Sequence, residues 1–288
     1  MKISFYTSVL LFLFITSNIE FISGQNEKIL DLDLMTYNIR YAADKPEIHS
    51  WNNRRNGIIK SISGIDIAGL QEVLPVQVND LTSNLPDYSI TGRSREQNPE
   101  EGEGVPIIYK KDRFLLLYSG TFWLSDNPHI PGSNTWNAAC NRIVTWGRFR
   151  DKQTGINFFV FNTHLDHISQ HAREKSIQLI LNTIRLMAPG SPVILMGDFN
   201  VEENNNVYKS IIDSGLKDTY REIKAASGSA DLTYHGWQNE TGLTRIDYVF
   251  VSSDFQVKNT QVIKKKENGI FPSDHFPVVT HIVLKKSE

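Results

Sequence analysis

Short apolar runs rich in Val, Ile, Phe and Tyr recur along most of the chain, and polar turns separate them. This composition is typical of strands, and runs that stay apolar throughout indicate strands buried on both faces. Ten such runs predict strands at residues 32–39, 66–73, 105–110, 114–124, 143–149, 157–165, 192–199, 246–252, 255–263 and 277–284. Several follow one another through short turns, so a simple alternation of strand and helix does not describe the chain.

A helical spacing of apolar residues appears in four places. The clearest is at residues 171–187, where Ile177, Ile180, Leu181 and Ile184 share one face and Pro189 follows. Shorter helices are predicted at residues 54–62, 76–85 and 207–212. Together these elements predict a large mixed α/β domain in which two sheets pack together and helices lie outside them.

The N-terminus has the layout of a secretory signal peptide. Lys2 provides a positive start, residues 9–15 form a compact apolar core, and small residues follow at Ser23 and Gly24. We therefore predict a signal peptide at residues 1–24, a single domain at residues 27–288, and a secreted or exported protein. An uncleaved signal anchor is the alternative; after cleavage no stable membrane span is expected.

Composition and charge limit the classes of partner. The chain has 288 residues, of which 40% are hydrophobic and 22% charged, so it is globular in character. A formal net charge of −2 gives no general attraction to nucleic acid or to an acidic membrane. Cys140 is the single cysteine, so no intrachain disulfide can form. We infer no protein partner.

Polar and ionisable residues stand at the ends of many apolar runs. An ionisable group in such a place is costly unless it is paired or binds a cation. One example would be an ordinary strand end, but this chain has several: Asn38, Glu72, His164, Asp198, Asn200, Asp247, Asp274 and His275.

The chemistry of this set is coherent. Asn38, Glu72 and Asp274 offer oxygen ligands that suit a hard cation such as Mg²⁺ or Mn²⁺. Histidines beside carboxylates move protons or stabilise phosphoryl oxygens. The combination indicates metal-assisted hydrolysis of a phosphate ester. The sequence has no HExxH pattern, no GxSxG motif and no P-loop, which leaves zincin, acyl-transfer and nucleotide-triphosphate chemistry unsupported.

Six ordered motifs resemble those of the endonuclease/exonuclease/phosphatase superfamily. They are TYNIR, LQE, NTHLDH, GDFN, IDYVFVS and SDHFPV, and they extend from Asn38 to Val278. The stretches SWNNRR, KKDRF, SGTFWLS and NRIVTW also resemble an exported, uncharacterised branch of it. The resemblance implies a four-layer α-β-β-α sandwich with two mixed, mainly antiparallel sheets and the site at one edge of them.

The resemblance also implies roles for individual residues. Glu72 would be the principal metal ligand, helped by Asn38 and Asp274. Asp198 would orient or activate the attacking water or protonate the leaving oxygen. The other implied roles are phosphate binding by Asn200, orientation of His275 by Asp247, hydrogen bonds from His275 and His164 to phosphoryl oxygens, phosphate contacts from Tyr109 and Arg142, and pairing of Glu103 with His164.

The predicted activity is metal-dependent hydrolysis of a phosphodiester, as in a nuclease, by direct attack of water on phosphorus. The predicted partner is a phosphate-ester substrate, which includes nucleic acid. The alternatives are a phosphatase or a phospholipase C-type phosphodiesterase acting on sphingomyelin, an inositol phosphate or a sugar phosphate. A non-catalytic secreted binding module and a glycoside-cleaving protein are alternatives of other classes, but the second leaves the Asp–His pairing unexplained.

Overall fold

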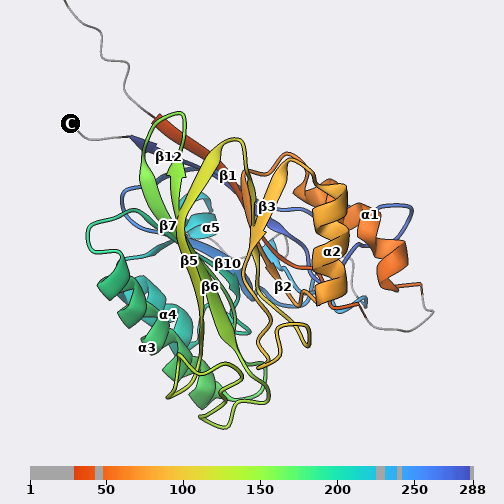
Figure 1. Ribbon diagram of the computed structural model, residues 1–288, viewed down its shortest axis with the longest axis horizontal. Coiled ribbons are helices and arrows are strands. Elements are labelled where there is room, and N and C mark those ends of the chain that lie inside the picture. The colour runs from red at the N-terminus through yellow and green to blue at the C-terminus, as the bar shows by residue number, and fades with distance from the viewer. Residues whose placement is uncertain (1–28, 43–47, 225–230, 239–241, 286–288) are drawn as a thin grey trace, which may run out of the picture.

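Two six-stranded sheets pack face to face, and helices cover their outer faces (Figure 1). The computed structural model describes residues 29–42, 48–224, 231–238 and 242–285. The predicted signal peptide lies outside the described residues. The arrangement of the described part confirms the predicted α/β sandwich of two mixed, mainly antiparallel sheets.

The first sheet has the strand order β11-β12-β1-β2-β4-β3. Its β1 and β2 are parallel, and its other neighbouring pairs are antiparallel. The bounds are β1 (Ile29–Asn38), β2 (Ile67–Gln71), β3 (Tyr88–Thr91), β4 (Ile107–Lys110), β11 (Gln256–Val262) and β12 (Val278–Lys285).

The second sheet has the strand order β5-β6-β7-β8-β10-β9. Here β7 and β8 are the parallel pair, and the other pairs are again antiparallel. The bounds are β5 (Phe114–Trp123), β6 (Ile143–Asp151), β7 (Asn157–His164), β8 (Val193–Asp198), β9 (Lys217–Asp218) and β10 (Asp247–Val251).

Each parallel pair is joined by a helix that crosses over the outside of its sheet, as parallel pairing requires. Helix α1 connects β1 to β2, and helix α3 connects β7 to β8. Among the described residues, no helix has the length and apolar character needed to cross a membrane. The bounds are α1 (Trp51–Ile62), α2 (Pro75–Asn84), α3 (Gln170–Met187), α4 (Asn206–Asp213) and α5 (Thr219–Ile223).

The four predicted helices and ten predicted strands all occur. The elements missed from sequence are β3, β9 and α5, which have 4, 2 and 5 residues. Such short segments contain too few positions for a period of 2 or 3.6 residues to be recognised. These short elements depend on tertiary contacts, so their own sequences carry no recognisable period.

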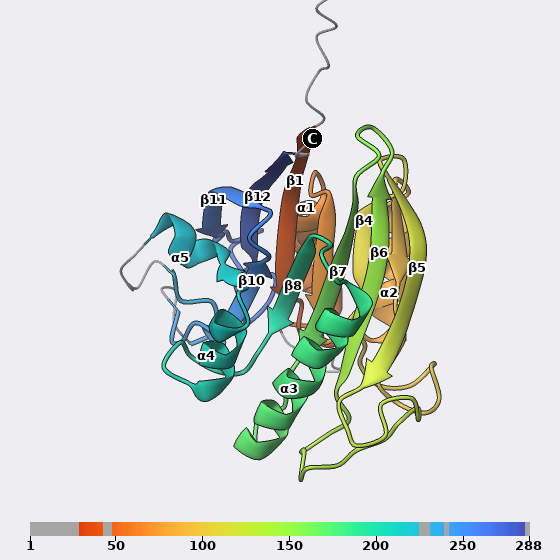
Figure 2. The same cartoon turned by 90° about the vertical axis from the view of Figure 1, so that its left-hand side faces the viewer.

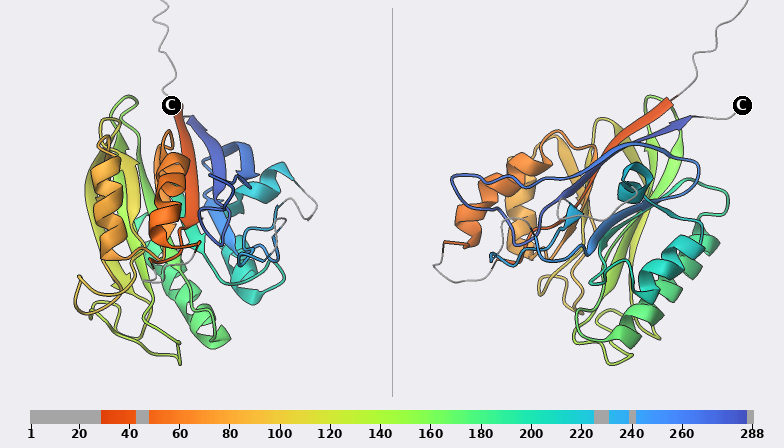
Figure 3. Two further views of the ribbon diagram at one scale, coloured as in Figure 1. Left: turned by 90° about the vertical axis from the view of Figure 1, so that its right-hand side faces the viewer. Right: turned by 180° about the vertical axis from the view of Figure 1, so that it is seen from behind.

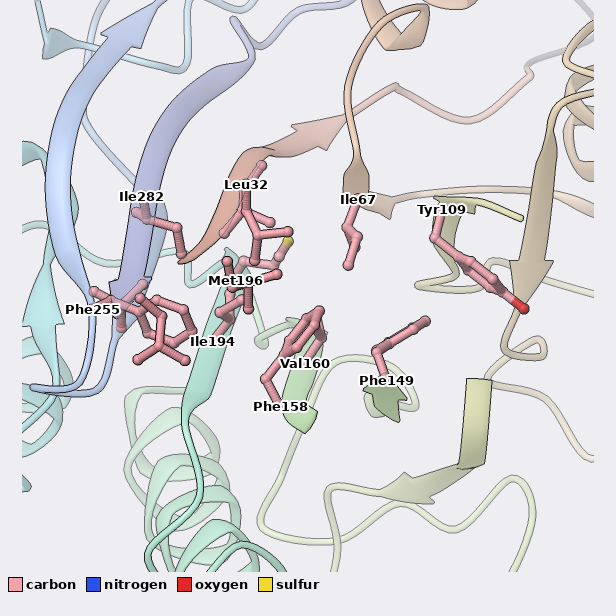
Figure 4. Packing of buried hydrophobic residues seen from close by; sticks show 14 of the residues in the cluster. Leu32, Ile67, Tyr109, Phe149, Phe158, Val160, Ile194, Met196, Phe255 and Ile282 are labelled. Carbon is pink, nitrogen blue, oxygen red and sulfur yellow. The ribbon is translucent and has the colours of Figure 1, made fainter. Parts of the chain in front are cut away.

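Three apolar clusters separate the four layers. The central cluster lies between the sheets and includes Leu32 and Ile67 from the first sheet and Phe158 and Met196 from the second (Figure 4). A second cluster joins the second sheet to α3 and α4, which lie in front of that sheet in Figure 2. A third joins the first sheet to α1 and α2, on the face turned to the viewer in the left panel of Figure 3.

The parallel pairs bring four strand ends to one edge of the sandwich. In the second sheet His164 is opposite Asp198, and Asp198 is opposite Asp247 on the next strand. In the first sheet Asn38 is opposite Gln71, the residue before Glu72. The other end of the first sheet holds the Ile29–Lys285 pair, so the described ends of the chain lie far from this edge.

Candidate active site

A pocket of about 410 Å³ lies at this edge and gathers polar side chains from both sheets. Asn38 and Asp247 are absent from its lining but hydrogen-bond to residues that line it. Eight of the residues with predicted roles line the pocket: Glu72, Glu103, Arg142, His164, Asp198, Asn200, Asp274 and His275.

His275 lies between two buried carboxylates. Its Nδ1 atom is 2.9 Å from Oδ2 of Asp247, and its Nε2 atom is 3.8 Å from Oδ2 of Asp198. Burial by itself would lower the pKa of His275, but the charge and hydrogen bond of Asp247 outweigh it and raise that pKa to about 10. The imidazole is therefore a cation at neutral pH, with Nε2–H directed to the Asp198 side.

Asp198 is the last residue of β8 and is almost completely buried. Burial, followed by the negative charge of Asp247, raises the pKa of Asp198 to about 7. Asn38 Nδ2 donates a hydrogen bond to Oδ2 (3.0 Å), and the backbone N–H of Asn200 donates one to Oδ1 (3.0 Å). A carboxyl group whose pKa lies near neutrality is suited to accept or release a proton at the reaction centre.

His164 lies on the other side of Asp198. Its Nε2 atom is 3.4 Å from Oδ2 of Asp198. Burial, followed by the positive charge of Arg142, lowers the pKa of His164 well below the usual histidine value. At neutral pH the two site histidines therefore differ in charge: His164 is neutral and His275 is positive.

Glu72 and Asp274 face one guanidinium group. Arg40 approaches Oε2 of Glu72 at 3.4 Å and Oδ2 of Asp274 at 3.8 Å. Glu72 follows the end of β2 with a positive φ of 60°, an uncommon conformation for a residue with a side chain. Two carboxylates that share a cation present the oxygen donors that Mg²⁺ or Mn²⁺ uses, so their chemistry fits such an ion.

Asn38 links the two halves of the site. Its Nδ2 group donates to Oε1 of Glu72 and to Oδ2 of Asp198, both at 3.0 Å. Its Oδ1 atom accepts the backbone N–H of Arg40 at 3.1 Å. The contacts present are therefore those of a carboxamide that spaces two carboxylates, rather than of an oxygen ligand pointing into the pocket.

Within the described part of the chain, two other groups of side chains come close enough to hold a metal ion. In the first, Asp198, Asp247 and His275, the imidazole is protonated and already bonded to Asp247, which makes it a poor ligand. In the second, Cys140, Asp166 and His167, the guanidinium of Arg142 lies 3.1 Å from Nδ1 of His167. Arg142 is 5% exposed, so this cation is held in place and opposes a metal ion there, whereas Arg40 beside Glu72 and Asp274 is 38% exposed and can move aside. The Glu72–Asp274 pair fits a metal better than either group.

Arg142 forms the basic wall of the pocket. It is 5% exposed, and besides His167 it approaches only the carboxylate of Asp166, at 3.9 Å, among the contacts of the described residues. Its Nε atom is buried and has no hydrogen-bond partner in the described part of the chain. A buried guanidinium at a pocket wall is suited to an anionic oxygen.

Glu103 also lines the pocket but does not pair with His164, contrary to the expectation. Its Oε2 atom is 2.8 Å from Nη1 of Arg95, another lining residue. The lining residues that were not predicted are Arg40, Tyr41, Arg95, Cys140, His167, Tyr234 and Ile246. Arg40 and His167 had a signal, because Arg40 ends the motif TYNIR and His167 ends the motif NTHLDH. Arg95, Cys140 and Tyr234 lie on loops without a strand-end pattern.

Tyr109 does not lie at the site, and the expected phosphate contact is corrected. It belongs to the central core cluster, and its ring packs against Phe149 at a centroid distance of 5.0 Å (Figure 4). Its partner across the sheet is Ile67, the first residue of β2, whereas the site is at the last residue of that strand. An apolar face of β4 thus directs the side chain into the sandwich.

Comparison with known proteins identifies the family. The model of the Endonuclease/Exonuclease/phosphatase family matches residues 35–275. An endonuclease/exonuclease/phosphatase structure from Bacteroides vulgatus is 34% identical, with a TM-score of 0.83, over 89% of this chain and all of that one. A mannosyl-6-phosphatase from Bacteroides thetaiotaomicron is 32% identical, with a TM-score of 0.81, over 87% and 99% of the two chains.

A more distant relative is Nocturnin of Drosophila melanogaster. It is 24% identical over 89% of this chain, and the match spans 46% of Nocturnin. The family match covers most of the chain and includes each strand end that forms the pocket. The protein therefore belongs to the Endonuclease/Exonuclease/phosphatase family of hydrolases.

Proposed function

We propose that the protein is a divalent-metal-dependent phosphoesterase that hydrolyses small phosphate esters, sugar phosphates foremost, by direct attack of water on phosphorus. The observation that carries the proposal is one pocket that combines three features. It holds a carboxylate pair suited to a metal, Glu72 and Asp274; a proton-handling pair, Asp198 and His275; and the buried guanidinium of Arg142.

Glu72 and Asp274 are the proposed metal ligands, and both of their carboxylates pair with Arg40. Mg²⁺ or Mn²⁺ bound there would supply positive charge against the phosphate oxygens. Because Arg40 contacts both carboxylates, it would have to move aside, toward solvent or toward the substrate, for a metal ion to be held there. Its 38% side-chain exposure allows this movement.

Side chains of the protein carry out the proton transfer and bind the phosphate oxygens. Asp198 orients the attacking water and takes its proton, for which a pKa of about 7 is suitable. His275, held by Asp247, donates a hydrogen bond to a phosphoryl oxygen as negative charge develops there. Asn200, His164 and Arg142 line the same pocket and contact the remaining phosphate oxygens.

The substrate class is proposed from the pocket and from the relatives. The motifs alone favoured a phosphodiester substrate such as nucleic acid. A pocket of about 410 Å³ instead suits a compound the size of a sugar phosphate, and no tryptophan is among the described residues that line it as a platform for a base. The 32% identity to a mannosyl-6-phosphatase along nearly its whole length supports the same class.

Phosphate release from a substrate panel tests this proposal. The purified protein is assayed with Mg²⁺, Mn²⁺ or EDTA on mannose 6-phosphate, glucose 6-phosphate, inositol phosphates, sphingomyelin, RNA and single-stranded DNA. The variants Asp198→Asn and Glu72→Gln serve as controls. We expect hydrolysis of sugar phosphates with metal, none in EDTA, and a loss of at least about 100-fold in kcat for Asp198→Asn.

Two outcomes would contradict the proposal in different ways. Faster hydrolysis of RNA, DNA or sphingomyelin would restore the phosphodiester expectation and reject the sugar phosphates. Inactivity on every substrate, together with no binding of Mn²⁺, would favour the non-catalytic binding module.

Export is a separate proposal that rests on residues 1–24 alone. Lys2 and the apolar core at residues 9–15 support it. N-terminal sequencing of the protein recovered from the producing cells tests it. A mature chain that begins after Gly24 supports cleavage, and an intact N-terminus contradicts it.

A further inference from the structure

Arg54 is a fully buried charge on helix α1, close to the site but outside the pocket. It is 1% exposed, and none of the ion pairs in the described part of the chain includes it. Burial lowers the pKa of Arg54 to about 10, so its guanidinium is still protonated at neutral pH. A buried cation without a carboxylate requires other groups to offset its lost hydration.

Backbone carbonyl groups fill this role. The guanidinium of Arg54 makes five hydrogen bonds, and every acceptor is a main-chain oxygen. The bonds run from Nε to His49 O (2.7 Å), from Nη1 to Ile39 O (2.7 Å) and Pro272 O (2.8 Å), and from Nη2 to Arg40 O (3.0 Å) and Tyr41 O (3.3 Å). The planar fork of an arginine matches such a set, whereas a lysine has three donors and no fork.

Four of the five acceptors belong to two segments that lie beside the metal-binding carboxylates of Glu72 and Asp274. Residues 39–41 follow Asn38 at the end of β1 and include Arg40, which faces Glu72. Pro272 precedes Asp274 by two residues, and Ser273 Oγ donates to the Asn38 carbonyl at 2.6 Å. Nη1 bonds to both segments at once, so it sets the distance between them.

Gly57 gives independent evidence that α1 packs against residues 272–274, the loop that carries Asp274. A Cβ atom added at Gly57 would lie 2.6 Å from Cγ of Pro272 and 3.0 Å from its Cβ. The proline ring cannot rotate away, so the helix meets the 272–274 loop with no room for a methyl group. The loop that carries Asp274 therefore rests on α1 at two neighbouring positions, one by hydrogen bonds and one by packing.

We propose that Arg54 is a positioning residue for the metal site. It ties the segment after Asn38 to the segment before Asp274. Because the Tyr41 N–H and the Asn38 side chain donate hydrogen bonds to Glu72, this tie fixes the separation of the carboxylates of Glu72 and Asp274. The inference rests on the proposed function, because it concerns the ion that Glu72 and Asp274 hold. Residues that orient metal ligands typically affect metal affinity by about 10- to 100-fold.

The test compares Mn²⁺ binding, followed by calorimetry without substrate, in the wild type and in three variants. Arg54→Lys keeps the charge but removes the fork, and Arg54→Met removes both. Arg55→Met is the matched control, because Arg55 is the next residue of the same helix and pairs with Asp80 at the surface. The melting temperature in EDTA is measured for every protein, and binding is measured well below it.

We expect Arg54→Lys to weaken Mn²⁺ binding about 10- to 100-fold and Arg55→Met to leave it unchanged. Gly57→Ala should weaken it in the same direction without touching the arginine, which keeps the test decisive if Arg54→Met does not fold. At saturating Mn²⁺, kcat of Arg54→Lys should recover toward the wild-type value.

A purely structural role gives a different result. Arg54→Lys would then melt earlier in EDTA, yet its folded form would bind Mn²⁺ as tightly as the wild type, and this outcome overturns the inference alone. A wild-type protein that binds no Mn²⁺ overturns the proposed metal dependence and the inference with it.

Discussion

The Nδ1 atom of His275 lies 2.9 Å from Oδ2 of Asp247, and both residues are buried although 28 positions separate them in the sequence. Asp247 begins β10, whereas His275 precedes β12 of the other sheet. The pair therefore bridges the two sheets of the sandwich at the edge that holds the pocket. Its geometry exists only when the sheets are packed.

Asp247→Asn should remove most of the activity while the fold persists. The amide cannot supply the negative charge that raises the pKa of His275 to about 10, so the imidazole loses its positive charge and its fixed orientation. We expect kcat to fall by about 100- to 10,000-fold with a smaller change in KM. Asp254→Asn, at a surface carboxylate bonded to Ser252, is the control. Wild-type kcat in Asp247→Asn would exclude this role.

Arg142→Met should lower kcat/KM for a phosphate substrate. The substitution keeps the apolar stem but removes a buried donor group from the pocket wall. A hydrogen bond to a charged group contributes about 1.5–3 kcal/mol, so kcat/KM should fall by about 10- to 150-fold. Arg148→Met is a matched control, because Arg148 lies on the adjoining strand over the ring of Phe159. If kcat/KM falls equally in both variants, the loss comes from a disturbed fold and not from a lost contact with phosphate.

Gly197→Ala should destabilise the protein and displace Asp198. Gly197 has a φ of 152°, and a Cβ atom there would lie 2.1 Å from the carbonyl oxygen of Thr163 on the neighbouring strand. The strain and the clash together should lower the free energy of unfolding by about 2–5 kcal/mol. Gly190→Ala is the control, since its φ is also positive but no atom lies within 4 Å of the added methyl group. If both variants lose a similar free energy of unfolding, the clash with Thr163 does not explain the effect at Gly197.

Glu203 should contribute stability that acid removes. Burial acts to raise its pKa, but hydrogen bonds and charge from Arg221 and Arg245 outweigh burial and lower it. A carboxyl group with a lowered folded pKa stabilises the fold above its unfolded pKa, near 4.5, and this stability is lost as the pH falls through the folded pKa.

Urea unfolding of Glu203→Gln measures this contribution. At pH 7 the variant should be less stable than the wild type by about 1–3 kcal/mol, and the difference should shrink below about pH 4. Glu222→Gln, at an exposed pair with Lys217, should change stability by less than about 1 kcal/mol. A difference that stays constant with pH would contradict the assignment to the charge of Glu203.

The sequence by itself determined the longer elements and identified eight of the described residues that line the pocket. The long strands were located from runs in which apolar residues alternate with polar ones or follow one another without a break. The 3.6-residue spacing of apolar residues located α3 to within one residue. Asp198 stood out because a carboxylate at the end of a buried strand is costly without a partner. These are local patterns, and local patterns are visible in a linear chain.

Tertiary structure alone decided which strand ends meet and what each polar group does there. Tyr109 was misplaced because its apolar neighbours on β4 do not reveal that its side chain points into the core. Glu103 was paired with the wrong residue because the loop that brings it to Arg95 has no periodic pattern. The charges of His164 and His275 differ for the same reason: burial and neighbouring charges set a pKa, and both arise only when the two sheets are packed.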